Sequence, residues 1–198
     1  MKKFHLAFLV LMLSIFASEA AVRLPSVIAD GMVIQRNEPV KIWGWADSGE
    51  EVTVRWKKEK VTTTADESGR WIVTLSPSKA GGPYTMTIGD ITINDILVGD
   101  VFLCSGQSNM ELPVARVMDM FAQEVLSYEN TQIRQLQIPQ TFDFNSEKDD
   151  TPAASWKPCT QENVMNFSAL AYFFAKELYK NGNYAKFLEA LPHKYYEE

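Results

Sequence analysis

The side chains best suited to covalent chemistry lie in one polar segment, residues 105–109, with the sequence Ser-Gly-Gln-Ser-Asn. An apolar run precedes it at residues 101–104, which is typical of a strand buried in a parallel sheet. A pattern with helical spacing follows from Pro113. Strand, polar turn and helix in this order place one side chain at the carboxyl edge of a sheet, near backbone N–H groups that stabilise an oxyanion. We therefore predict that Ser108 is the nucleophile of an acyl transfer, the alternative being a polar turn without chemistry.

Two amide side chains, Gln107 and Asn109, flank this serine. Each can donate a hydrogen bond to an acyl oxygen or bind a sugar hydroxyl, so both are candidates for oxyanion or substrate binding. The alternative is that they hydrogen-bond the turn itself, as asparagine readily does.

A serine hydroxyl is a weak nucleophile at neutral pH and needs a base to take its proton. The sequence holds two histidines, His5 and His193, and we interpret His193 as an exposed surface residue. Cys104 and Cys159 have no histidine nearby, so we predict neither metal binding nor thiol catalysis. We expect two free thiols, a disulfide being the alternative, and no metal or organic cofactor.

The net charge bears on the binding partners of the protein, and the first twenty residues bear on its location. A net charge of −6 without a basic cluster argues against nucleic-acid binding. Residues 1–20 combine a basic start, an apolar core and small residues at their end, which is typical of a secretory signal peptide. The apolar core is too short to cross a bilayer, so we expect export without stable membrane insertion, an uncleaved anchor being the alternative.

Residues 22–97 read as short strands separated by turn residues. Apolar and polar residues alternate over 52–56, 71–75 and 84–88, as in half-buried strands. This pattern predicts a β-sandwich domain, immunoglobulin-like or jelly-roll-like. We expect its tryptophans to fill the core or to pack against the next domain, with stacking on sugar rings as the alternative; they are Trp43, Trp45, Trp56 and Trp71.

Residues 98–182 predict an α/β domain. Apolar residues at helical spacing follow Pro113, a strand is indicated at 133–138, and a second helical face runs from Phe167 to Leu178 before Asn181-Gly182 ends it. We expect the two strands to be parallel, joined by a right-handed crossover.

Several motifs are similar to those of a known family. The segment 99–111 resembles the nucleophile block of the sialate O-acetylesterase family, within the SGNH (GDSL-like) hydrolases. The similarity spans about residues 22–182, through segments 24–25, 30–36, 43–46, 69–71, 80–84 and 166–169. It implies that the α/β part is SGNH-hydrolase-like, that Ser108 attacks O-acetyl groups of sialic acid or related acetylated sugars, and that Gln107 and Asn109 belong to the site.

The resemblance ends at Gly182, and residues 183–198 diverge from the family. Family members take their catalytic aspartate and histidine from a block near the carboxyl end, which this sequence lacks. We therefore interpret the chain as the amino-terminal part of such an esterase, with little or no activity of its own. Two alternatives stay open: a non-catalytic carbohydrate-binding module, and a remnant that does not fold stably.

Overall fold

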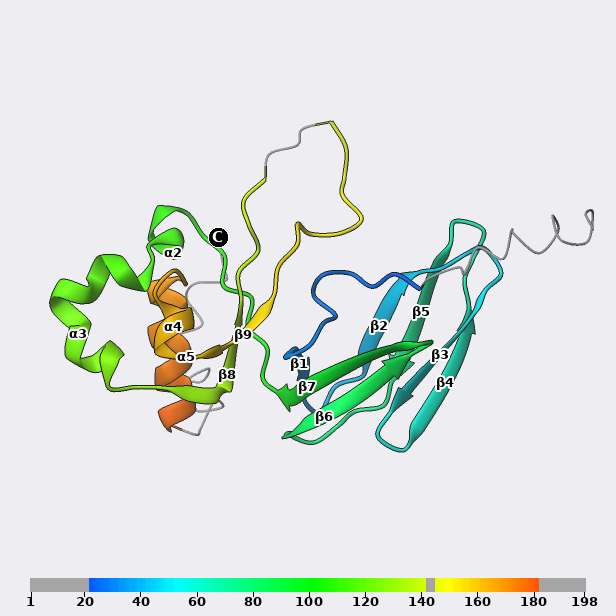
Figure 1. Cartoon of the computed structure of the whole chain (residues 1–198), viewed down its shortest axis with the longest axis horizontal. Helices are drawn as coiled ribbons and strands as arrows, with labels where there is room; N and C mark the ends of the chain where they lie inside the picture. Colours follow the sequence, from blue (N-terminus) through cyan, green and yellow to red (C-terminus); the bar gives the residue numbers. More distant parts are fainter. Residues whose placement is uncertain (1–21, 142–144, 182–198) are drawn as a thin grey trace, which may run out of the picture.

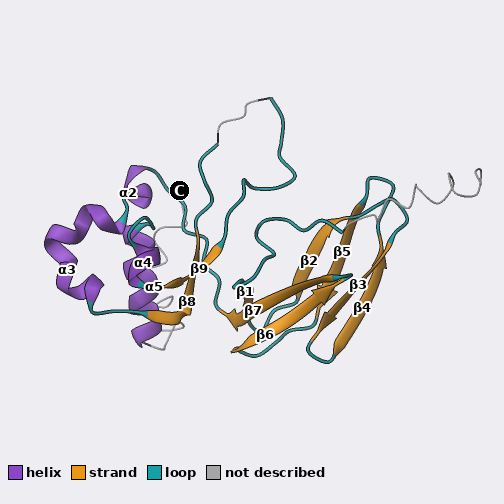
Figure 2. Ribbon diagram, in the orientation of Figure 1, coloured by secondary structure: helices purple, strands orange, loops and turns teal. Residues whose placement is uncertain are grey.

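The computed structural model describes residues 22–141 and 145–181 (Figure 1). The predicted signal peptide at 1–20 and the divergent tail at 183–198 lie outside the described residues. Strands fill the first half of the chain, and most helices come later (Figure 2). The strands of the first half are β1 (Val33–Gln35), β2 (Val40–Trp45), β3 (Glu51–Trp56), β4 (Glu59–Thr64), β5 (Arg70–Leu75), β6 (Gly81–Ile88) and β7 (Ile91–Gly99).

Five of these strands form one mixed sheet in the order β1-β7-β6-β3-β4. The short strand β1 runs parallel to β7, with Ile34 opposite Val98, while the other neighbours in the sheet are antiparallel. Strands β2 and β5 form a separate antiparallel pair. The sheet curls, so that its inner face surrounds an apolar core.

The predicted alternation of buried and exposed residues is confirmed in these strands. Val52, Val54 and Trp56 of β3 are buried, and so are Trp71, Val73 and Leu75 of β5, while the residues between them face outward. Met86, Ile88 and Ile96 complete the same core from β6 and β7. Burial of this apolar surface is the main force that holds the strands together.

The predicted β-sandwich was wrong. The strands form a curled mixed sheet that resembles half of a barrel, rather than two facing antiparallel sheets. The reason is that alternation fixes which side chains face the core, but it does not fix which strands become neighbours. In particular, the parallel pairing of β1 with β7 joins segments about sixty residues apart in sequence.

The second half of the chain carries short helices and one β-ribbon. The elements are α2 (Ser108–Glu111), the 3-10 helix η2 (Val114–Val117), α3 (Met118–Leu126), β8 (Asn130–Leu136), β9 (Trp156–Cys159), α4 (Gln161–Val164) and α5 (Ala169–Asn181). They enclose a second, smaller core that includes Val114, Val125, Val164 and Tyr172. Within residues 22–141 and 145–181, no helix is both long and apolar enough to cross a membrane.

The predicted parallel α/β arrangement is not present in this half. Strand β8 covers most of the predicted segment 133–138, but its partner β9 runs antiparallel to it. Residues 101–104 form no strand and are exposed, with 90% of the Leu103 surface accessible. An apolar run becomes a buried strand only when neighbouring strands pair with it, and no described strand lies beside this one.

The second predicted helix is confirmed as α5, although its buried face differs from the predicted one. Ala171 and Leu178 are buried as expected, whereas Leu170 is 54% exposed and Lys176 is buried instead. Both cysteines are free thiols, as expected. Cys104 is exposed rather than buried in a strand, whereas burial raises the pKa of Cys159 to about 11.

The tryptophans divide into two groups. Trp56 and Trp71 are buried in the core, as the packing interpretation predicted. Trp43 is 38% exposed, and Trp45 is half-buried on the same outward face of β2. The packing interpretation is therefore correct for two of the four and wrong for Trp43.

Candidate active site around Ser108

The segment that leads to Ser108 is fastened at its start to β1. The Arg36 guanidinium forms an ion pair with Asp100, with Nε and Oδ1 2.8 Å apart. The Gln35 side chain accepts a hydrogen bond from the Val101 N–H at 2.9 Å, and the Arg36 N–H donates to the Gly99 carbonyl. The curled sheet thus fixes the point from which the exposed segment 101–107 leaves.

The far end of the segment is held by the start of α5. The Ala169 N–H donates to the Leu112 carbonyl at 2.8 Å, and the Val114 N–H donates to the Phe167 carbonyl at 2.9 Å. The Ser168 hydroxyl contacts the Met110 sulfur at 3.4 Å. The sequence motif at 166–169 therefore holds α2 in position. The sequence alone did not identify this role.

Between these two anchors, the aromatic ring of Phe102 packs edge-on against Phe174 of α5, with ring centroids 5.3 Å apart. Gly106 lies close to the helix that follows, since a Cβ at this position would be 3.2 Å from the Met110 Cβ. A side chain at residue 106 would therefore push the turn away from α2. The turn that carries the predicted nucleophile is thus positioned through contacts on both sides.

Ser108 is the first residue of α2, and its side chain is exposed. The carbonyl of the preceding residue, Gln107, accepts hydrogen bonds from the N–H groups of Met110 and Glu111, at 2.9 and 3.3 Å. The N–H groups of Ser108 and Asn109 find no acceptor within the described residues. They remain available to an oxygen placed beside the serine hydroxyl.

The three predicted site residues, Gln107, Ser108 and Asn109, are consecutive and all exposed. The Gln107 side chain makes no hydrogen bond to the helix it precedes. Across the described part of the chain, no side-chain hydrogen bond joins the Ser108 hydroxyl to a carboxylate or an amide. The structure therefore places a hydroxyl and two amides at one exposed turn, and none of the described residues bonds the hydroxyl as a base would.

The groups that would complete a proton relay or hold a metal do not come together in the described region. Neither histidine lies there, because His5 and His193 both fall outside residues 22–141 and 145–181. No group of three or more His, Cys, Asp or Glu residues with metal-binding geometry occurs among the described residues. The turn offers an exposed alcohol next to two backbone N–H groups, those of Ser108 and Asn109, for which the described part of the chain provides no acceptor.

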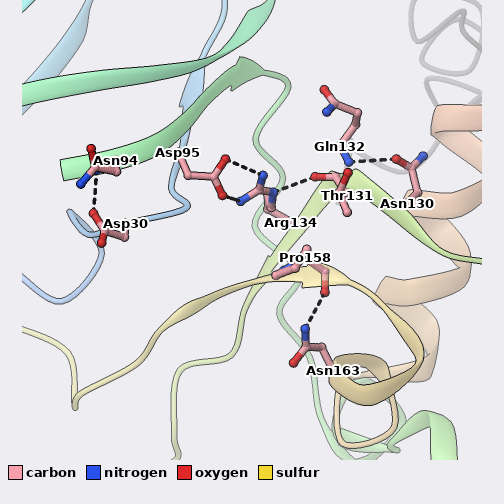
Figure 3. A network of polar contacts seen from close by, with 9 residues as sticks. All are labelled: Asp30, Asn94, Asp95, Asn130, Thr131, Gln132, Arg134, Pro158 and Asn163. Carbon is pink, nitrogen blue, oxygen red and sulfur yellow. Dashed lines mark hydrogen bonds and ion pairs between the residues drawn. The ribbon is translucent and has the colours of Figure 1, made fainter.

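A polar network joins the β8–β9 ribbon to the curled sheet (Figure 3). The Arg134 guanidinium of β8 forms a two-pronged ion pair with Asp95 of β7, at 2.5 and 3.0 Å, and its Nε donates to the Thr131 carbonyl. The Trp156 indole N–H donates to the Val27 carbonyl at 2.9 Å. These contacts hold the half of the chain that carries Ser108 against the strand half.

Asp95→Asn is expected to lower the free energy of unfolding by about 1–3 kcal/mol, because it takes the charged acceptor from a guanidinium with only 6% of its side chain exposed. Asp95 has a φ of 57°, a conformation that asparagine also tolerates, so the substitution adds no backbone strain. Urea unfolding of the wild type and the variant at neutral pH measures the difference.

The same ion pair predicts a pH dependence. The hydrogen bond from Arg134 lowers the pKa of Asp95 below its ordinary value of 3.8. A lowered pKa in the folded state means that the contribution is complete above pH 3.8 and is lost as the pH falls through the folded value. The stability difference between wild type and Asp95→Asn should therefore shrink below pH 3.8, and a difference absent at neutral pH would contradict this account.

Comparisons with known proteins point to one class of enzyme. No protein-family model matches the chain. The sialate O-acetylesterase of Mus musculus is 33% identical over 187 residues, which cover 82% of this chain and 34% of that protein. The sialate O-acetylesterase of Homo sapiens is 32% identical over 204 residues, covering 89% of this chain and 38% of that protein.

A solved structure gives the same indication. A carbohydrate acetylesterase from Xanthomonas citri superposes with a TM-score of 0.78 at 36% sequence identity, over 82% of this chain and 38% of that one. In fold and in sequence, this chain is therefore similar to the corresponding part of carbohydrate esterases. It belongs to the sialate O-acetylesterase family. The chain spans a little over a third of the length of these relatives.

Proposed function

We propose that this chain carries the nucleophile segment of a serine esterase that removes O-acetyl groups from sialic acid or related acetylated sugars. The observation that carries the proposal is the exposed Ser108 hydroxyl at a turn fixed on both sides by β1 and α5. Membership of the sialate O-acetylesterase family supports the choice of an acetylated carbohydrate as substrate.

In the proposed reaction, the Ser108 Oγ attacks the acetyl carbonyl carbon, and a base takes the hydroxyl proton. The carbonyl oxygen becomes an oxyanion near the N–H groups of Ser108 and Asn109, with the Gln107 and Asn109 amides as further donors. The C–O bond to the sugar then breaks, and the sugar oxygen takes up a proton. Water cleaves the acetyl–serine ester in a second step and releases acetate.

The proposal includes a limit on this polypeptide. A serine without a base reacts slowly, and the described residues place no base beside Ser108. We propose that a histidine and an aspartate supplied from outside this 198-residue chain complete the relay, and that the chain alone is inactive. We also propose that the segment at 1–20 directs export of the protein, because an exported esterase would reach extracellular glycans.

The 198-residue chain is expected to hydrolyse 4-nitrophenyl acetate no faster than its Ser108→Ala variant. The physical reason is that the hydroxyl keeps its proton and the attacking alkoxide does not form. Release of 4-nitrophenol, measured with equal concentrations of the two proteins, checks the expectation. A rate that depends on Ser108 would contradict the inactivity of the chain alone and would show that a base is present.

A further inference from the structure

The outward face of the β2–β5 pair presents apolar side chains to solvent. Trp43 is directly opposite Ile72 in the register of the two strands, and these side chains are 38% and 51% exposed. Trp45 lies opposite Arg70 on the same face. The buried neighbours Ile42 and Trp71 fill the core on the other side, so the outward residues are not needed to complete it.

A hollow of about 530 Å³ lies over this face. Its lining includes the apolar side chains of Trp43, Trp45 and Ile72 and the charged side chains of Asp66, Arg70 and Asp149. An ion pair between Arg70 and Asp149 connects β5 to the segment that follows β8, so the lining comes from two distant parts of the sequence. This volume falls within the range of small-molecule sites.

We propose that this hollow binds a neutral sugar ring. A pyranose has an apolar C–H face that packs on an indole, and hydroxyl groups at its edge that need both donors and acceptors. The hollow offers this combination, because the Trp43 ring and guanidinium and carboxylate groups all belong to its lining. The Arg23 guanidinium lies 3.6 Å from the centroid of the Trp45 ring, so Trp43 is the more open stacking surface.

The charges around the hollow are balanced, which favours a neutral ligand. The carboxylates of Asp66, Glu147 and Asp149 are matched by Arg70, Lys148 and the Arg23 guanidinium beside Trp45. The hydrogen bond from the Ser68 hydroxyl lowers the pKa of Asp66, which keeps that carboxylate ionised. An anionic sugar such as a sialoside therefore gains no net attraction here, and a neutral hexose needs none.

This sugar site is independent of the proposed esterase chemistry. The β2–β5 pair and α2 lie on opposite sides of the β8–β9 ribbon (Figure 1). No described contact joins Trp43 to the turn of Ser108. Binding at the hollow would hold a glycan on the enzyme whether or not Ser108 reacts, and one proposal can fail without the other.

The test is a titration of the ¹⁵N-labelled 198-residue chain with lactose, a neutral disaccharide, and with 3′-sialyllactose, its acidic counterpart. The Trp43 indole N–H signal, assigned by its loss in Trp43→Phe, is expected to shift with lactose, and to shift no more with 3′-sialyllactose at equal concentration. Trp43→Ala should weaken lactose binding, followed at the Trp45 signal, by about tenfold. Trp43→Phe keeps an aromatic ring, so its affinity for lactose should fall less. Ser108→Ala should bind lactose as tightly as the wild type does.

Unchanged indole N–H signals of Trp56 and Trp71 in Trp43→Ala show that the core is intact. If these signals change, the lactose affinity of Trp43→Phe is compared with that of the wild type instead. The proposal is overturned if lactose leaves the Trp43 signal unmoved, or if Trp43→Ala binds lactose as tightly as the wild type. It is also overturned if the Trp43 signal moves on dilution of the protein instead, since this would mean that a second copy of the chain covers the face.

Discussion

Replacing Ser108 with alanine is expected to reduce kcat by about a thousandfold or more in a chimera that supplies the rest of an esterase. In this chimera, residues 22–181 replace the matching segment of the Xanthomonas citri carbohydrate acetylesterase, which superposes with a TM-score of 0.78. The loss is large because removing the hydroxyl removes the covalent route, and no neighbouring side chain can replace it. Initial rates with 4-nitrophenyl acetate measure it.

Ser105→Ala is the matched control, because it removes a hydroxyl from the same exposed segment, three residues earlier. The chimera with Ser105→Ala is expected to keep a rate close to that of the unmodified chimera. Equal losses at both positions would indicate that the turn itself had been disturbed. An active chimera that is insensitive to Ser108→Ala would refute the role of Ser108.

Trp56→Ala is expected to lower the free energy of unfolding by about 3–5 kcal/mol. Trp56, the last residue of β3, is 2% exposed in the core, its ring meets Tyr84 edge-on at 5.6 Å, and its indole N–H reaches the Ser78 hydroxyl at 3.4 Å. Removing the ring leaves a cavity that the surrounding strands cannot close. Urea unfolding of the 198-residue chain, followed by circular dichroism, measures the change.

Trp43→Ala provides the comparison within the same group of strands. The Trp43 ring is 38% exposed, so its removal is expected to lower the free energy of unfolding by less than about 1 kcal/mol. Similar losses for the two variants would mean that Trp43 contributes to the core. That result would also weaken the argument that its ring is free to bind a sugar.

The local features of the fold could be predicted from the sequence, whereas the strand pairing could not. The alternation in β3 and β5 identified the buried side chains correctly, because a strand has a strict period of two. The pairing of β1 with β7 could not be inferred, because it depends on contacts between distant segments. The prediction of a buried strand at 101–104 failed for a related reason. Hydrophobicity indicates a tendency to be buried, but it does not show that a neighbouring strand is there to pair with.

The candidate site was predictable as a local motif but not as a supported structure. The exposed turn follows from the small polar residues at 105–109, whereas the helical pattern was predicted from Pro113 and α2 already begins at Ser108. The Arg36–Asp100 ion pair joins residues 64 apart, and Ser168 meets Met110 across 58 residues. Nothing in the spacing of these residues indicates that they meet, although all four lie in segments that resemble the family.

The central claim is that the Ser108 oxygen forms a bond to the acetyl carbon. The most direct measurement is mass spectrometry of the chimera after an acid quench during turnover of 4-nitrophenyl acetate, with digestion to locate the modification. We predict one acetyl group on the peptide that contains Ser108, and none on that peptide in the Ser108→Ala chimera. An acetyl group trapped at a different residue, with Ser108 unmodified while the chimera turns over, would contradict the account.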